Sequence, residues 1–296
     1  MLDHVRIAAV AVDTQPGRLS ENLQKISLWT KKAAAVGAQL VLFQELSLSG
    51  FIPNHPTGNH DKWLREALQI GRKIAESLDG PAVQQLSQIA ADHNVLICAG
   101  MLEDAGNLLH NTQVLVDGTG LRGFWRKMHV PMYEMPFYNG GGIPDVVETP
   151  LGRIGVNICF DALMPESTRL LAVKNVEIVL FPFAADPPPV TPQGWAAWAA
   201  TALKARCIEN GIFGVACNYV GTVNCASVSQ SFPGGGMAID PRGQIFGEWT
   251  APTGEPGMLL VDLSAELLRQ ARAEPEYLFR FRRPELYGPL ANIAES

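Results

Sequence analysis

The sequence lacks the features of a nucleic-acid-binding, secreted or membrane-spanning protein. Its formal net charge is −6 with a pI near 5.5, and no basic stripe is present to attract a phosphate backbone. The most apolar run, Val176–Ala185, is short and is interrupted by Glu177 and Pro182. The first residues lack the basic-then-apolar pattern of a signal peptide. We therefore expect a cytoplasmic protein with neither nucleic acid nor membrane as a partner.

Cysteine is also scarce, and its spacing excludes common frameworks. The five cysteines are odd in number and form no Cys-x-x-Cys pair; they are Cys98, Cys159, Cys207, Cys217 and Cys225. Such spacing is typical of free thiols in a reducing compartment and not of a disulfide scaffold or a zinc site. The sequence predicts no metal.

No linker divides the chain. The 296 residues are 47% hydrophobic and 18% charged, and no Pro/Gly/Ser-rich stretch or charge run separates two halves. We expect one domain over residues 1–263. Residues 264–296 then form a helix and a tail rich in arginine, proline and aromatic residues over Tyr277–Pro284, which needs a surface on its own domain or on a partner subunit.

Strands alternate with helices along most of the chain, which predicts an α/β fold. The unit Val5–Val12, a helix capped by Ser20 and ending near Gly37, and Leu40–Phe43 is βαβ-like. Further apolar runs predict buried strands; they are Val95–Gly100, Leu108–Val116, Leu121–Arg126, Arg153–Ile158, Ile178–Phe181 and Phe213–Cys217. Helical patterns cover Asp61–Ser77, Pro81–His93, Glu166–Lys174 and Gln193–Asn210, and a late meander covers Gly236–Asp262.

The second of these strands ends at an acid, Glu45. A carboxylate directly after an apolar strand is expected to be partly desolvated, which favours a role as a base near neutral pH. It can equally be a strand-end carboxylate that faces water or caps a turn. The segment alone leaves both interpretations open.

Lys127 follows another strand end, within a segment that also holds His129 and Glu134. A lone lysine at such a place is more commonly a solvated residue on a sheet edge. His129 can activate a nucleophile, as in Cys–His hydrolases, or it can be a hydrogen-bonded structural residue. Glu134 can orient Lys127 or lie on the surface.

Cys159 comes at the end of the strand Arg153–Ile158, where a side chain is held rigidly and still reaches a cleft. Most free cysteines are small buried hydrophobic residues. A thiol attacks as thiolate and needs help to ionise, so the nucleophile interpretation requires a base and a cation from elsewhere in the chain. Glu45 and Lys127 are the residues that could supply them.

Taken together, these three segments resemble the motifs of the nitrilase superfamily of carbon–nitrogen hydrolases. The segments are Phe43-Gln-Glu45-Leu-Ser-Leu-Ser-Gly50-Phe51, Trp125-Arg-Lys127-Met-His129 and Asn157-Ile-Cys159-Phe-Asp161-Ala-Leu-Met-Pro165-Glu166. The likeness extends from about Val5 to Asp262 and includes Asn218 and the turn at Asp240. It implies a four-layer α-β-β-α sandwich and assembly into a homodimer or higher homo-oligomer.

The resemblance also implies a mechanism. Glu45 would be the general base, Cys159 the nucleophile, and Lys127 the positive charge facing the developing oxyanion. The backbone N–H of Phe160 would be a second donor to that oxygen, and Glu134 would position Lys127 and the substrate. Attack on an amide carbon would release ammonia or an amine and leave a thioester for water to cleave, with no cofactor.

The residues after the cysteine bear on the substrate. True nitrilases tend to have Trp then Glu there, whereas Phe160 and Asp161 are closer to the amidase and carbamoylase branches. Branches that bind a free carboxylate carry arginine in the region filled here by residues 162–164. We therefore expect a small neutral or aromatic amide, in a cleft to which several residues can contribute; they are Phe51, Tyr133, Phe160, Phe183, Ala184 and Trp195. Each aromatic can equally belong to the core.

Four other functions remain as alternatives. The enzymatic ones are hydrolysis of an N-carbamoyl compound, a true nitrilase reaction, and a Cys–His hydrolase that uses His129 or His110. The last would leave Glu45 and Lys127 without a role. A non-catalytic scaffold would not need all three groups of the motif.

Overall fold

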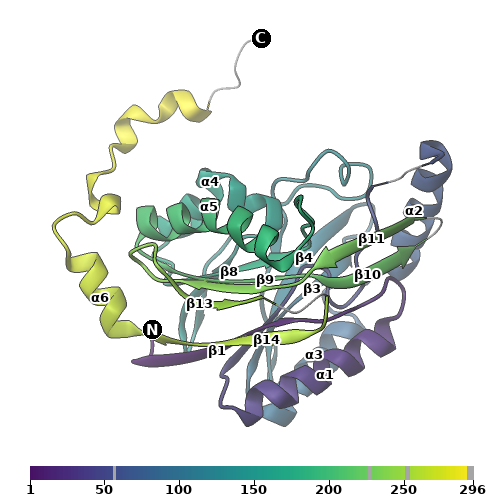
Figure 1. The fold of residues 1–296 in the computed structure, drawn as a ribbon, viewed down its shortest axis with the longest axis horizontal. Coiled ribbons are helices and arrows are strands. Elements are labelled where there is room, and N and C mark those ends of the chain that lie inside the picture. The colour runs from purple at the N-terminus through teal and green to yellow at the C-terminus, as the bar shows by residue number, and fades with distance from the viewer. Residues whose placement is uncertain (56–57, 226–227, 251–253, 292–296) are drawn as a thin grey trace.

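The computed structural model describes residues 1–55, 58–225, 228–250 and 254–291. Within these residues, two six-stranded sheets face each other (Figure 1). The first has the order β14 (Gly257–Ser264), β1 (His4–Ala11), β2 (Leu40–Phe43), β3 (Leu96–Asp104), β4 (Leu109–Asp117), β5 (Gly120–Arg126). The second has the order β13 (Ile245–Trp249), β12 (Gly236–Ile239), β9 (Phe213–Asn218), β8 (Ile178–Phe183), β7 (Gly152–Val156), β6 (Val147–Thr149).

Helices cover the outer face of each sheet, so the expected four-layer α-β-β-α arrangement is confirmed (Figure 1). The first sheet is covered by α1 (Leu19–Ala35) and α3 (Pro81–His93), and the second by α4 (Pro165–Ala172) and α5 (Pro192–Asn210). A further helix, α2 (His60–Ile74), lies near one end of the sheets.

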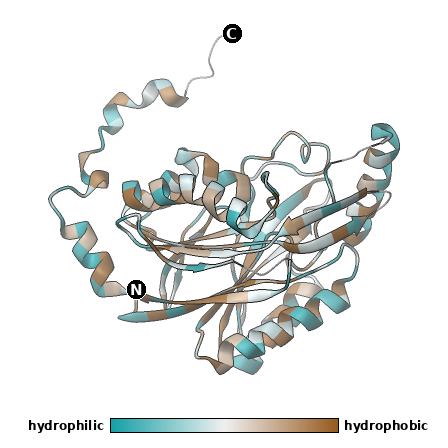
Figure 2. Cartoon of the chain, viewed as in Figure 1, coloured by the Kyte–Doolittle hydropathy of each residue, from teal (hydrophilic) through white to brown (hydrophobic). Residues whose placement is uncertain are grey.

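Both faces of the strands are buried, which explains their continuous apolar sequence. In β1, Ile7 and Ala9 join the cluster that contains side chains of the second sheet. The alternate residues Ala8 and Val10 join a separate cluster with side chains of α1 and α3. Successive side chains of a strand point to opposite faces, so a strand between two layers must be apolar throughout. Figure 2 shows this concentration of apolar residues along the strands.

The strand directions bring several strand ends to one edge. In the first sheet β1, β2 and β3 are parallel, and β5 returns to that direction because β3–β4 and β4–β5 are both antiparallel. In the second sheet β7, β8 and β9 are parallel. The carboxyl ends of parallel strands share an edge, so residues that follow β2 and β5 lie together, as do those that follow β7, β8 and β9.

Two local details differ from the sequence-based expectation. Ser20 does not cap the first helix: α1 begins at Leu19, and its N-cap residue Arg18 makes no side-chain cap. The strand before Cys159 ends at Val156, not at Ile158, because the chain turns sharply just before the cysteine.

A two-stranded sheet of β10 (Val220–Cys225) and β11 (Val228–Pro233) was not expected. The burial of β11 alternates, but one of its inward positions is the polar residue Gln230. That glutamine interrupts the alternation of apolar and polar residues by which a strand is recognised in a sequence. Only Val228 and Phe232 remain as inward apolar residues before the closing proline.

The C-terminal segment leaves the sheets through α6 (Ala265–Ala273) and continues in short 3₁₀ turns beside α4 (Figure 1). Its first part touches the body: the Tyr277 hydroxyl donates to the Asn210 carbonyl at 3.1 Å, and Arg169 lies over the Phe279 ring. Further on, Phe281 and Leu290 are 64% and 74% exposed. Residues 292–296 of the expected tail lie outside the described residues. In the described part of the chain, no helix combines the length and apolarity that a membrane crossing requires.

Gly100 couples the core of the first sheet to the turn after β2. An added Cβ would lie 2.2 Å from the Leu46 backbone nitrogen and 3.0 Å from the Glu45 carbonyl carbon. We predict that Gly100→Ala lowers the free energy of unfolding by about 1–3 kcal/mol, the usual cost of overpacking. Urea denaturation measures this. Gly142→Ala is the matched control, because its added methyl meets nothing within 4 Å. Equal effects of the two substitutions would contradict the packing argument.

Candidate active site

Four residues from three distant segments, Glu45, Lys127 with Glu134, and Cys159, converge at the shared edge of the sheets. Glu45 lies just beyond β2, Lys127 directly after β5, and Cys159 just beyond β7. The Lys127 Nζ donates to Glu45 Oε1 and to Glu134 Oε2, each at 2.8 Å. The Cys159 thiol lies close enough for the charges of Glu45 and Lys127 to shift its pKa, and the backbone N–H of Ala184 donates to it.

This group is almost completely closed to water. Glu45 and Lys127 have no exposed surface, whereas Glu134 is 4% and Cys159 8% exposed. Cys159 is therefore the most exposed residue of the group.

Burial and pairing determine the charges of the site. Burial alone would lower the pKa of Lys127, but the carboxylates of Glu134 and Glu45 outweigh it and hold that pKa well above its ordinary value. Burial raises the pKa of Glu134 to about 7; Lys127 opposes this rise, and the nearby negative charge of Glu45 adds to it. Lys127 is thus a permanent cation shared by two acids.

The Cys159 thiol is protonated at rest. Burial and then the charge of Glu45 raise its pKa well above the ordinary value, and the opposing effect of Lys127 is smaller than these two. The sequence suggested that the lysine would favour the thiolate. The direction of that effect is confirmed, because Lys127 lowers the pKa of Cys159, but burial and the charge of Glu45 act more strongly. Attack must therefore be coupled to removal of the thiol proton.

The backbone at the cysteine is strained. Cys159 has φ +48° and Leu46, directly after Glu45, has φ +52°, in the left-handed region that non-glycine residues rarely adopt. Such conformations persist only where surrounding contacts impose them, and they concentrate at functional sites. Cys159 also begins a 3₁₀ turn, Cys159–Leu163. Because the first N–H groups of a helical turn lack partners within it, the N–H of Phe160 is suited to bind a ligand oxygen beside the thiol.

Asn111 supports both Glu45 and Lys127. Its Nδ2 donates to Glu45 Oε1 at 2.6 Å, and its carbonyl accepts the Lys127 backbone N–H at 2.8 Å. Glu45 Oε1 thus receives two hydrogen bonds, whereas Glu45 Oε2 is buried and has no partner among the described residues. Sequence reasoning missed Asn111. The signal was a run of four polar residues, 110–113, inside the otherwise apolar strand β4, all of them buried.

Asp161 joins the lysine segment to the cysteine turn. Its carboxylate accepts the backbone N–H groups of Met128 (3.2 Å) and His129 (2.8 Å) from one segment and of Ile158 (3.3 Å) from the other. It is 1% exposed. The residues next to Lys127 and Cys159 are therefore attached to one buried carboxylate, which fixes the spacing of the two segments.

His129 belongs to this support and not to the nucleophile. Its Nδ1 lies 2.9 Å from Asp161 Oδ1 and 3.2 Å from the Ser167 hydroxyl. The hydrogen bond to Asp161 raises the pKa of His129, and the lesser effect of burial opposes that rise. His110, the other histidine considered from the sequence, has its Nδ1 bonded to the Asn139 carbonyl at 2.8 Å.

The residues expected to line the cleft fall into two groups. Phe51 and Trp195 lie inside hydrophobic clusters: Phe51 meets Phe232 edge-on with ring centres 5.1 Å apart, and Trp195 meets Phe183 at 5.9 Å. Phe51 and Trp195 are 1% and 0% exposed, and their rings are packed against other side chains. We expect them, together with the 1% exposed Phe183, to support the cleft wall from behind.

Tyr133 and Ala184 lie closer to solvent or to the thiol. Tyr133 is 49% exposed and contacts the ring of His55 edge-on at 5.7 Å. Ala184 is next to Ala185, whose backbone N–H and carbonyl both pair with the side chain of Asn218 at 2.9 Å. This double contact fixes the backbone segment that aims the Ala184 N–H at Cys159.

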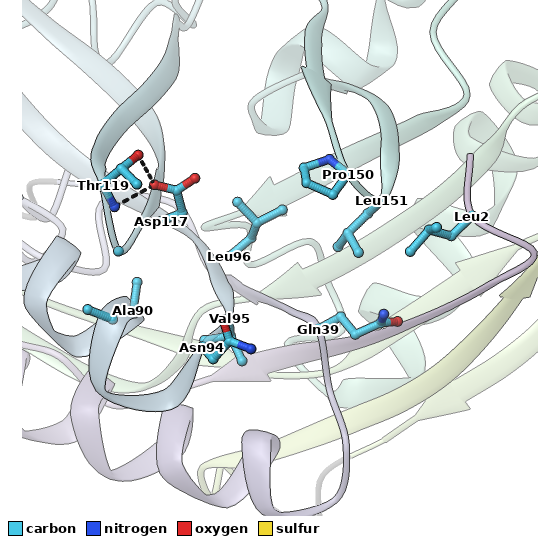
Figure 3. A pocket seen from close by; sticks show the side chains of 12 residues that line it. Leu2, Gln39, Ala90, Asn94, Val95, Leu96, Asp117, Thr119, Pro150 and Leu151 are labelled. Carbon is cyan, nitrogen blue, oxygen red and sulfur yellow. Dashed lines mark hydrogen bonds between the residues drawn. The ribbon is translucent and has the colours of Figure 1, made fainter.

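A separate cavity of about 570 Å³ lies at the opposite edge of the first sheet (Figure 3). Its lining includes Gln39 and Leu96, where β2 and β3 begin, and Asp117, where β4 ends. Asp117 is the one acid or base among the described residues that line it, and this carboxylate bonds to the backbone N–H and hydroxyl of Thr119. We assign no chemistry to this cavity. Over the described residues, no three His, Cys, Asp or Glu side chains are grouped to hold a metal ion.

The sequence profile of the carbon-nitrogen hydrolase family matches residues 6–273. The chain belongs to this family and is a hydrolase of carbon–nitrogen bonds. It is 29% identical over 285 residues to a nitrilase of Pyrococcus abyssi (strain GE5 / Orsay), covering 96% of this chain and 99% of the relative. It is 29% identical over 286 residues to an (R)-stereoselective amidase of a Pseudomonas species, covering 96% and 93%.

A solved structure shows the same relationship. An amidase from Nesterenkonia sp. superposes with a TM-score of 0.76 at 25% identity, covering 97% of each chain. A variant structure of the Nesterenkonia sp. AN1 amidase, at 25% identity and TM-score 0.74, covering 96% of each chain, shows the acetamide moiety of fluoroacetamide covalently attached at its active-site cysteine. The nitrilase-superfamily assignment made from the three motifs is confirmed by the family match.

We predict that Glu45→Gln separates thiol ionisation from turnover. Glu45 raises the pKa of Cys159, so removing its charge lowers that pKa and increases the thiolate fraction at any given pH. Loss of the base should nevertheless slow hydrolysis about 10²–10⁴-fold. Thiolate absorbance in the ultraviolet, with Cys159→Ala subtracted, measures the first effect, and product release measures the second. A thiol pKa that rises in the variant would contradict this picture.

We predict that His129→Asn preserves turnover at alkaline pH and lowers stability in acid. The pKa of His129 is raised in the folded state, so its stabilising effect is complete below its ordinary pKa of 6.5 and is lost as the pH rises through the folded value. Melting temperatures of both proteins across this range test the prediction. Near-complete loss of turnover with an intact fold would instead support a Cys–His hydrolase.

Proposed function

We propose that the protein is an amidase that converts a small amide into a carboxylic acid and ammonia through a thioester on Cys159. The observation that supports this best is the asymmetry of Glu45. Its Oε1 accepts from Lys127 and Asn111, and its Oε2 is buried with no partner in the described part of the chain. An oxygen that no other group occupies is available to accept a proton, which supports Glu45 as the base.

In the first half of the proposed reaction, the Cys159 sulfur attacks the amide carbon while Glu45 accepts the thiol proton. Negative charge develops on the carbonyl oxygen, where Lys127 and the Phe160 N–H stabilise it. Preorganised donors of this type contribute on the order of 3 kcal/mol each to transition-state stabilisation. The carbon–nitrogen bond then breaks, and Glu45 returns its proton to the leaving ammonia.

In the second half, water attacks the thioester carbon and Glu45 takes a proton from it. The tetrahedral intermediate collapses, the carbon–sulfur bond breaks, and the proton returns to the departing sulfur. The acid leaves and the protonated thiol is restored. Lys127 remains charged in both halves because Glu134, joined by Glu45 whenever Glu45 is ionised, holds its pKa high.

The relatives support amide hydrolysis over the alternatives. A Pseudomonas relative is named an amidase, and the Nesterenkonia structure of 25% identity is that of an amidase. A nitrilase is the second candidate, since the Pyrococcus relative carries that name. Hydrolysis of an N-carbamoyl compound is the third. A scaffold is least consistent with a buried lysine that is shared by two acids.

We also propose that the protein works as a homodimer or larger homo-oligomer, with the C-terminal tail against a neighbouring copy. The large apolar side chains of the tail are exposed in the single chain; they include Leu278, Phe281, Leu286 and Leu290. Exposed apolar patches of this kind commonly mark association surfaces.

We predict ammonia release from small amides by the wild type and none by Cys159→Ala. The panel holds aliphatic and aromatic amides, N-carbamoyl compounds and nitriles, each assayed for ammonia and for the acid product. Cys207→Ala is the matched control, because Cys207 is a fully buried thiol outside the site. Turnover restricted to nitriles would replace the proposal by the second candidate. Inactivity of the wild type towards every amide would overturn it.

A further inference from the structure

A chain of polar contacts leads outward from the catalytic acids to the surface. Glu134 Oε1 accepts from Asn54 Nδ2 at 3.4 Å, and the Asn54 backbone N–H donates to Gln230 Oε1 at 3.0 Å. Gln230 Nε2 in turn donates to Asp186 Oδ2 at 3.1 Å. The amides are 7% and 6% exposed, whereas the side chain of Asp186 is 21% exposed. Asp186 is thus the outer end of a chain that begins at Lys127.

Asp186 is fixed near the nucleophile. It directly follows Ala185, whose backbone is clamped by Asn218, and lies two residues from Ala184, whose N–H faces Cys159. The only ion pair that Asp186 makes within the described residues is with His55 Nδ1 at 3.5 Å, and the His55 side chain is 51% exposed. The described contacts include no hydrogen bond to Asp186 Oδ1, which leaves that oxygen for a ligand.

Asn54 presents a second acceptor. Because its NH₂ group faces the carboxylate of Glu134, its Oδ1 must point the other way. That oxygen is buried and has no partner among the described residues. A buried carbonyl without a donor costs free energy, so a ligand that brings an N–H group to it is favoured.

The polar groups near the reacting carbonyl are therefore hydrogen-bond donors, whereas those further out are acceptors. The donors assigned to the reacting carbonyl oxygen are Lys127 and the backbone N–H of Phe160, while the Ala184 N–H donates to the Cys159 sulfur. Beyond them the chain offers oxygen acceptors, Asn54 Oδ1 and Asp186 Oδ1. No arginine or lysine pairs with this outer region among the described contacts. A substrate that fits must carry an acceptor at its reacting end and donors at its other end.

We propose that Asp186 selects the substrate, and that the enzyme prefers amides whose acyl chain ends in an ammonium group. The ammonium would donate to Asp186 Oδ1, with Asn54 Oδ1 as a second acceptor along the chain. A terminal carboxylate would be repelled by the same groups. This inference rests on the proposed amide hydrolysis and narrows the neutral or aromatic amide expected from the sequence.

The test compares linear amides of increasing length, each in three forms that end in ammonium, methyl or carboxylate. At the best-fitting length, kcat/KM for the ammonium form should exceed that for the methyl form roughly tenfold. A charge-assisted hydrogen bond contributes on the order of 1.5–3 kcal/mol, and solvent weakens it here because the Asp186 side chain is 21% exposed. The carboxylate form should be the poorest of the three.

Asp186→Asn should reduce the ammonium-to-methyl ratio of kcat/KM to about one, chiefly through KM, and Asp186→Lys should reverse the order of ammonium and carboxylate. Glu148→Gln is the charge-matched control. Its side chain is 78% exposed on β6, before the turn into β7, whereas Cys159 follows the far end of β7, so the ratio should not change. A methyl form that equals or exceeds the ammonium form at every length would overturn the proposal. So would a loss in Asp186→Asn that is equal for all three forms.

A binding readout separates this inference from the proposed reaction. The rate at which iodoacetamide alkylates Cys159 is measured with each compound present, which requires no turnover. If no amide is hydrolysed but the ammonium forms protect Cys159 best, the proposed function fails and the assignment of Asp186 stands. If amides are hydrolysed but the ammonium forms protect no better than the methyl forms, the assignment fails alone.

Discussion

The structure of the site depends on one buried cation, Lys127, held between the carboxylates of Glu45 and Glu134. A lysine with no exposed surface is strongly unfavourable unless it is paired and hydrogen-bonded. Two acids satisfy it. One of them, Glu45, adds to the effect of burial in raising the pKa of the neighbouring Cys159 thiol, so the arrangement that stabilises the lysine also acts on the nucleophile.

The pairing also constrains the sheets. Glu45 and Lys127 follow strands of the first sheet and Cys159 follows a strand of the second, so the site exists only if both sheets stack in one register. Beyond the strand ends, side-chain hydrogen bonds hold the loops in place of hydrogen bonds between strands. Asn111 supports Glu45 and Lys127, and Asp161 joins the lysine segment to the cysteine turn. Preorganised catalytic geometry requires such support by side chains.

Local sequence patterns predicted the alternation of strands and helices and singled out the charged residues of the site, whereas the four layers were implied by the resemblance to the family. An apolar strand that ends in a polar residue is visible at Glu45, Lys127 and Cys159 without knowledge of any contact. The partners of these groups were not visible, since Asn111 and Asp161 act on segments that are distant in the chain. The sequence could not decide whether Trp195 lies in the core or in the cleft wall, because both places favour large aromatic side chains.

The two-stranded sheet of β10 and β11 lies outside both six-stranded sheets, yet it carries Gln230, which holds Asp186 in place. The catalytic residues that follow strands of the six-stranded sheets and the glutamine that contacts Asp186 therefore belong to different parts of the fold. Residues of β11 can change without altering the strands that position Lys127 and Cys159. An ancestral enzyme of this architecture could acquire new substrates by small, separate steps, each leaving its bond-breaking apparatus intact.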